Sequence, residues 1–131
     1  MIGIQVGVLG LEGHMRKLEQ AERENFERRL DEAIFRGAQL VHDTAVTIVP
    51  VRYGRLKNSI RIEKKGPFRY AVKAGGTTVL GKYVDYAHFM EFGTRKVRPR
   101  PFLVPAAEAR RKEVEKLVAD AVSPLKIRRM R

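Results

Sequence analysis

Three histidines are the side chains best suited to bind a metal or transfer a proton: His14, His42 and His88. Helical metal sites place two histidines four residues apart, as in HxxxH or HExxH, so that both face one ion. These three lie far apart, and His42 falls beside the apolar stripe of a predicted helix. The chain also lacks cysteine, which excludes disulfides, cysteine-ligated zinc and thiol nucleophiles. We therefore interpret each histidine as a packed or surface residue.

Glu91 is the one acidic residue inside an apolar cluster, residues 89–92. Acid–base catalysis by its carboxyl group would need a second acid or base within reach. The nearest acid in the sequence, Asp85, lies six residues earlier, which is poor spacing for one helix face. The structural alternative, which we favour, is that Glu91 pairs with an arginine such as Arg95 or accepts backbone N–H groups.

Neither a phosphate-binding loop nor a nucleophile motif occurs in the sequence. The segment Gly75-Gly76-Thr77 lacks the lysine and the spacing of a P-loop. No segment resembles the turn that presents the serine of a nucleophile elbow. The sequence therefore predicts a protein that is not an enzyme and needs no cofactor, and a small nuclease is the weakest alternative.

The formal net charge is +12, and the basic excess increases toward the C-terminus. Residues 1–36 hold six bases and seven acids, residues 37–94 nine and four, and residues 95–131 twelve and four. A basic surface favours nucleic acid, an anionic membrane or an acidic protein, and charge alone does not choose among them. No uncharged run approaches the ~20 residues that span a bilayer, and residues 1–10 lack the pattern of a signal peptide.

Two basic segments and the tyrosines could contact nucleic acid. Their cations could neutralise phosphates, and the phenol rings could stack on bases. Solvation, or contact with acidic groups of another subunit, is the favoured interpretation for the cations, and core or interface packing is favoured for the tyrosines. These residues are Arg95, Lys96, Arg98 and Arg100 in a basic arm, Lys126, Arg128, Arg129 and Arg131 in a basic tail, and Tyr53, Tyr70, Tyr83 and Tyr86.

Apolar periodicity predicts a strand and a long helix in the first part of the chain. Residues 2–9 alternate, and their glycines indicate a sheet edge or a close backbone approach. Residues 11–20 predict a short helix or the start of a long one. From Ala21 to Ile48, apolar residues recur every three or four positions, which predicts an amphipathic helix ~40 Å long that ends before Pro50. Gly37 on its apolar face would let another element approach closely.

The remaining segments predict a hairpin and two further helices. Residues 50–59 predict a turn-rich connection, residues 59–64 and 68–74 two strands, and residues 77–82 an irregular loop. Residues 86–92 predict a short helix with Gly93 as its left-handed cap, and residues 106–122 predict a helix that Pro124 ends. The predicted fold is α+β, with the long N-terminal helix and the C-terminal helix packed on a small antiparallel sheet. Residues 1–122 would form one domain, followed by the basic tail, 123–131.

Three segments resemble, in order, the signatures of the tail-completion or neck proteins of long-tailed bacteriophages. They are PVRYGRLKNSI at residues 50–60, YAHFMEFGT at residues 86–94 and PFLVPA at residues 101–106. Glycines in them can adopt positive φ at sharp turns, threonine can bond backbone groups, and the prolines with phenylalanine would anchor the last helix. We predict structural or interface roles for Gly54, Leu56, Tyr86, Glu91, Gly93, Thr94, Pro101, Phe102 and Pro105.

The resemblance implies a minor structural protein of the virion, assembled in the host cytoplasm, at the junction between head and tail. It implies a ring, six- or twelve-fold, around the DNA channel, between the head-closure and tail-terminator rings. Contact with DNA in the channel and no contact with a membrane are further expectations. The alternative is a basic nucleic-acid-binding module, which predicts tight duplex binding with a steep salt dependence.

Overall fold

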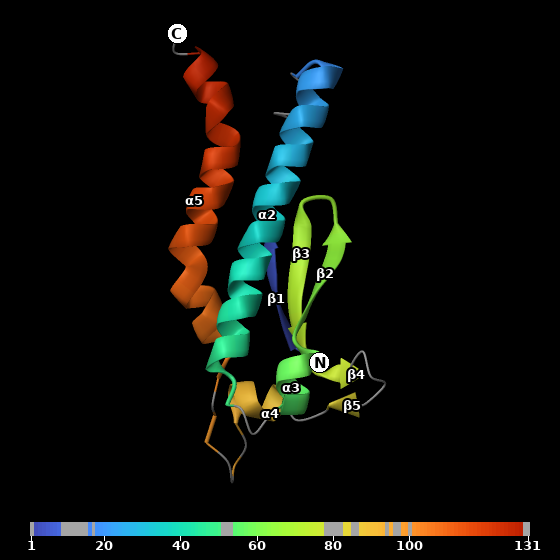
Figure 1. Ribbon diagram of the computed structural model, residues 1–131, viewed down its shortest axis with the longest axis vertical. Helices are drawn as coiled ribbons and strands as arrows, with labels where there is room; N and C mark the ends of the chain where they lie inside the picture. Colours follow the sequence, from blue (N-terminus) through green and yellow to red (C-terminus); the bar gives the residue numbers. More distant parts are fainter. Residues whose placement is uncertain are drawn as a thin grey trace.

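The computed structural model describes residues 2–8, 16, 18–50, 54–77, 83–84, 87–93, 95, 98–99 and 101–129. Within these residues, two long helices lie side by side and a small sheet lies against the first of them (Figure 1). In chain order the elements are β1 (Ile2–Gly7), α2 (Gln20–Ile48), α3 (Gly54–Ser59), β2 (Arg61–Gly66), β3 (Arg69–Ala74), β4 (Gly76–Thr77), β5 (Tyr83–Val84), α4 (Ala87–Phe92) and α5 (Leu103–Arg129). The fold is α+β, as predicted.

Helix α2 forms because one face of residues 20–48 is apolar and the opposite face is largely charged. Its start is sharp, since Glu19 has an extended backbone, and its end is sharp, since Val49 is extended before Pro50. The long helix is confirmed and begins at Gln20, since Leu18 and Glu19 are not helical; most of residues 11–17 lie outside the described residues. The buried face consists of Phe26, Leu30, Ala33, Ile34, Gly37, Ala38, Val41 and Ala45.

The main sheet is antiparallel, with strand order β1-β3-β2. Strand β1 is an edge strand, as its glycines predicted, and a Cβ on Gly7 would lie 2.7 Å from the carbonyl oxygen of Phe68. On β3, Tyr70, Val72 and Ala74 are buried in the core that α2 covers. The predicted hairpin is confirmed, with a bulge near Lys65 and a positive φ of 59° at Phe68 in its turn.

Helix α5 packs chiefly on α2 and meets the sheet at β1. The helices approach closely at Gly37 of α2, where a Cβ would lie 2.9 Å from Cγ1 of Val114. Arg110 Nε also donates a hydrogen bond of 2.8 Å to Thr44 Oγ1, joining the helices beside this contact. The prediction that Pro124 ends the helix is wrong, since α5 continues to Arg129. Proline removes one intrahelical hydrogen bond and strains the preceding turn, but the helix can continue beyond it with a bend.

Two predictions in the connection after α2 are wrong. The segment from Gly54 to Ser59 is a helical turn and a half, α3, and not only turns. Gly54 does not have the positive φ that was expected, because it is the first residue of this helix, and a Cβ on it would meet no atom within 4 Å. Leu56 and Ser59 of α3 are buried.

Strand β3 ends at two glycines with positive φ, Gly75 at 88° and Gly76 at 74°. Beyond them, β4 and β5 form a separate two-stranded antiparallel ladder. Helix α4 is confirmed, and Gly93 follows it with φ 74°, the left-handed cap that the sequence predicted. No helix in the described part of the chain is long and apolar enough to cross a membrane.

Candidate functional site

Glu91 holds the start of helix α5. It lies on α4, its side chain is buried, and its carboxylate accepts three backbone hydrogen bonds. Oε1 accepts from the N–H of Phe102 at 3.1 Å and of Leu103 at 2.8 Å, and Oε2 accepts from the N–H of Val104 at 3.3 Å. A carboxylate at this place also interacts favourably with the positive end of the helix dipole. The sequence left two structural roles open for Glu91: pairing with an arginine, or accepting backbone N–H groups. In the structure Glu91 accepts backbone N–H groups.

The first four N–H positions of α5 are thereby accounted for. A helix start leaves four such groups without an intrahelical acceptor. Glu91 binds three of them, and the fourth residue, Pro105, has no N–H to satisfy. The first intrahelical bond follows at once, from the N–H of Ala106 to the carbonyl oxygen of Phe102 at 3.3 Å. The predicted place of Pro105 in the first turn is confirmed.

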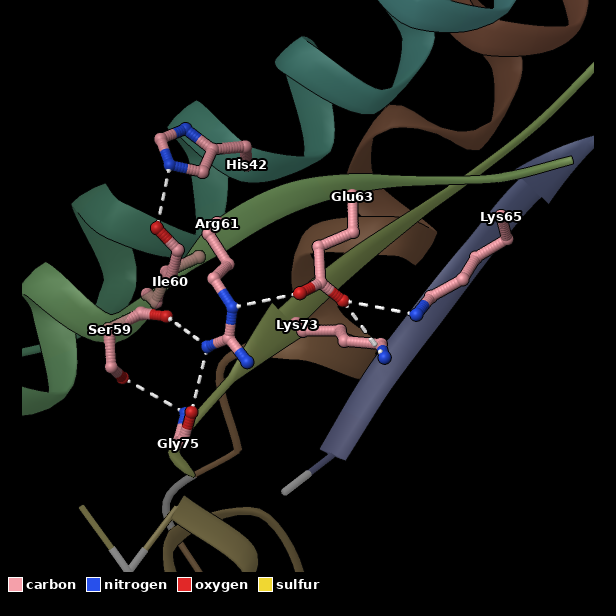
Figure 2. Close-up of polar contacts among 8 residues, drawn as sticks. All are labelled: His42, Ser59, Ile60, Arg61, Glu63, Lys65, Lys73 and Gly75. Carbon is pink, nitrogen blue, oxygen red and sulfur yellow. Dashed lines mark hydrogen bonds and ion pairs between the residues drawn. The ribbon is translucent and has the colours of Figure 1, made fainter. Parts of the chain in front are cut away.

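A second junction joins α3 to the end of β3. The buried Ser59 Oγ donates to the carbonyl oxygen of Leu56 at 2.6 Å and accepts the N–H of Gly75 at 3.0 Å. Arg61 Nη1 donates to the carbonyl oxygens of Ser59 at 3.0 Å and Gly75 at 2.8 Å, as Figure 2 shows. These bonds fix the point at which the chain leaves the main sheet for β4.

His42 and Tyr70 are packing residues. His42 Nε2 lies 3.1 Å from the carbonyl oxygen of Ile60, so this half-buried ring links α2 to the start of β2. Tyr70 is buried against Phe35, with ring centroids 5.3 Å apart, and its hydroxyl donates to Asp31 Oδ2 at 2.8 Å. Burial and this hydrogen bond raise the pKa of Tyr70 to about 12, so the phenol stays protonated. The core interpretation of Tyr70 is confirmed.

The face of the sheet that points away from α2 carries a group of charged residues, which we call the basic sheet face. At its centre Glu63 on β2 forms three ion pairs (Figure 2). Its Oε2 lies 2.9 Å from Lys73 Nζ and 3.1 Å from Lys65 Nζ, and its Oε1 lies 3.4 Å from Arg61 Nε. The ion pairs with Lys73, then Lys65, lower the pKa of Glu63 from 4.5 to about 2, against a small opposing effect of burial. Three cations thus surround one permanent anion.

The ion pairs of Glu63 should make stability depend on pH in the acid range. Because its pKa is lowered by folding, their contribution is present above about pH 4.5 and is lost as the pH falls toward 2. We expect Glu63→Gln to lose stability at pH 5 and to approach the parent protein as the pH falls to 2. Urea unfolding across this pH range measures the difference in stability between Glu63→Gln and the parent. Glu108→Gln, on the exposed face of α5, is the control. Parallel pH profiles for Glu63→Gln and the parent would contradict the assignment.

The remaining predicted site residues separate into three groups. Leu56 and Phe102 are buried, whereas Pro101, Arg95 and Arg98 are exposed. Lys126, Arg128 and Arg129 belong to the backbone of α5, but their side chains lie outside the described residues. The side chains of Tyr83 and His88 are likewise not described, and several residues lie outside the described part altogether: His14, Tyr53, Tyr86, Thr94, Lys96, Arg100 and Arg131.

The basic sheet face was missed by sequence reasoning, although a signal for it exists. Alternation along residues 59–64 and 68–74 places Arg61 and Glu63 of one strand, and Arg69 and Lys73 of the next, on the same face. The pairing of Arg61 with Lys73 and of Glu63 with Ala71 then brings the charges together. The sequence pattern does not determine this register or the irregularity near Lys65.

The arrangement supports structural work and surface contact. No group of three or more metal-binding side chains occurs among the described residues. The two junctions fix backbone groups with buried polar side chains, and the basic sheet face presents excess positive charge.

Comparison with known protein families matches residues 12–93 to a family described as "HK97-gp10_like: Bacteriophage HK97-gp10, putative tail-component". The chain therefore belongs to the HK97-gp10-like family of bacteriophage tail components, and its role is a structural one in the virion. The match covers the segment at residues 50–60 and reaches Gly93, whereas the PFLVPA segment lies beyond it. No curated protein and no solved structure matches the chain significantly.

Proposed function

We propose that this tail component acts at the neck of the virion, where it completes the tail and joins it to the head. The observation that carries the proposal is the family match over residues 12–93. The structural role of Glu91 and the α3 junction supports it, since buried polar residues in both signatures fix the backbone and need no catalytic partner. In this role the chain forms a ring around the DNA channel, between the head-closure and tail-terminator rings.

An exposed apolar patch at the start of α5 supports subunit contact. Phe92 is 61 % exposed and Val104 is 40 % exposed. Both residues lie at the junction of α4 and α5, because Phe92 follows Glu91 in the chain and Glu91 binds the N–H of Val104. Large apolar side chains gathered at a surface mark contact sites, and repeated contacts of unlike surfaces close into rings when the rotation fits.

Deletion of the gene in the phage tests the proposal. We expect lysates with filled heads and separate tails, and no infectious particles, because the junction between the two structures is not completed. Electron microscopy and plaque counts measure this result, and supply of the intact protein from a plasmid should restore joined particles. Normal infectious virions without the protein would overturn the proposed role.

A further inference from the structure

The basic sheet face has more cations than its one carboxylate can neutralise. Arg61, Lys65 and Lys73 pair with Glu63, and Arg69 is exposed on the same face. This leaves four cations and one anion on two short strands, β2 and β3. Cations held close together repel one another, and a polyanion laid across them lowers that electrostatic free energy. The arrangement therefore favours a negatively charged partner.

Two of the cations on this face, Lys65 and Arg69, are exposed to solvent. Residues of β1 and β3 between the charged side chains are small, since Gly3 and Gly7 have no side chain and Ala71 is buried by its neighbours. Both long helices lie on the other side of the sheet or at its β1 edge, and Gly3, Gln5 and Gly7 are exposed. Lys65 and Arg69 therefore project from the face, whereas the side chains of Lys73 and Arg61 are only 19 % and 27 % exposed.

The composition of the face distinguishes between two kinds of anionic partner. Protein–protein contacts are enriched in aromatic residues and depleted of lysine and glutamate at their centre. The basic sheet face has the opposite composition, with no aromatic or large aliphatic side chain among its described residues. Contacts to a nucleic-acid backbone are made by lysine and arginine, with no requirement for apolar surface.

We propose that the basic sheet face binds the phosphate backbone of double-stranded DNA without reading its sequence. The cations contact phosphates, and the carboxylate of Glu63 competes with the phosphates for Lys65 and Lys73. The choice of DNA as the polyanion rests on the proposed function, which places the chain beside the DNA channel. Its residues belong to β2 and β3 and are not those of the basic arm and tail.

Fluorescence anisotropy of a short labelled duplex, titrated with the purified full chain at several salt concentrations, tests the proposal. We expect the double variant Lys65→Ala/Lys73→Ala to bind several-fold more weakly. The slope of log K against log salt should become shallower by about 0.9 for each phosphate that the variant no longer neutralises. The matched control is Lys112→Ala/Lys116→Ala, which removes the same charge from the exposed face of α5 and should bind like the parent.

The variant Glu63→Gln tests whether the lysines around Glu63 bind phosphates or only stabilise the fold. Removal of the carboxylate should destabilise the fold, as should Lys73→Ala, but the two should act in opposite directions on DNA affinity. We expect Glu63→Gln to bind DNA more tightly, because the phosphates no longer face a carboxylate. Unchanged affinity in Lys65→Ala/Lys73→Ala, an equal weakening in the α5 control, or weaker binding by Glu63→Gln would each overturn the proposal. If the protein is still required for joined virions, the neck role stands and only the DNA contact is refuted.

Discussion

Replacing Glu91 by alanine is expected to lower the free energy of unfolding by about 3 kcal/mol and the midpoint of thermal unfolding by about 10 °C. The carboxylate accepts the N–H groups of Phe102, Leu103 and Val104, and the first two belong to buried residues. Hydrogen bonds to a charged acceptor contribute about 1.5–3 kcal/mol each. The total is smaller than three such bonds, because removal of the carboxylate also ends the cost of burying its charge.

Two variants make this measurement specific. Glu91→Gln keeps one oxygen acceptor and should lose about half as much stability. Glu108→Ala, on the exposed face of α5, should change the unfolding free energy by no more than about 0.5 kcal/mol. Hydrogen exchange should also become faster at residues 102–104 in Glu91→Ala. A loss no greater than that of Glu108→Ala would show that other groups hold the start of α5.

The sequence predicted well those elements in which apolar residues recur several times at the spacing of a helix or a strand. Helix α2 keeps one apolar face over 29 residues, and β3 places Tyr70, Val72 and Ala74 on the core face of the sheet. Helix α3 was missed because six residues contain less than two turns, so no periodicity can develop. The extension of α5 past Pro124 was missed because the effect of a proline depends on the support that the rest of the helix receives.

The candidate sites depended on contacts between distant segments. Glu91 reaches residues 11 to 13 positions later, and its local sequence allowed either an arginine or the backbone as partner. Its apolar neighbours did signal burial, and a buried carboxylate must find donors, so the prediction that its role is structural was sound. The ion pairs of Glu63 needed the pairing of β2 with β3, which alternation alone leaves free to shift.

Substitution of Gly37 by leucine is expected to lower the free energy of unfolding by about 3 kcal/mol, because it forces α5 away from α2. A Cβ at this position already lies 2.9 Å from Val114 Cγ1 and 3.5 Å from Val6 Cγ1, and valine cannot rotate its branched carbons far out of the way. Any L-residue can adopt the backbone conformation at position 37, since Gly37 lies within α2 and has no positive φ. Gly37→Ala should therefore be near neutral, with the gain of about 1 kcal/mol in helix propensity offset by the contact with Val114.

A double-mutant cycle with Val114→Ala identifies the contact itself. Removal of both γ carbons of Val114 makes room for a Cβ on residue 37, so Gly37→Ala should stabilise the Val114→Ala protein by about 1 kcal/mol while leaving the parent unchanged. Gly54→Ala is the matched glycine control, because a Cβ there meets no atom within 4 Å and no coupling to Val114 is expected. Urea unfolding of the four proteins measures the coupling, and hydrogen exchange in α5 shows whether that helix loosens in Gly37→Leu. Strictly additive effects of Gly37→Ala and Val114→Ala would mean that the two helices do not depend on this glycine for their close approach.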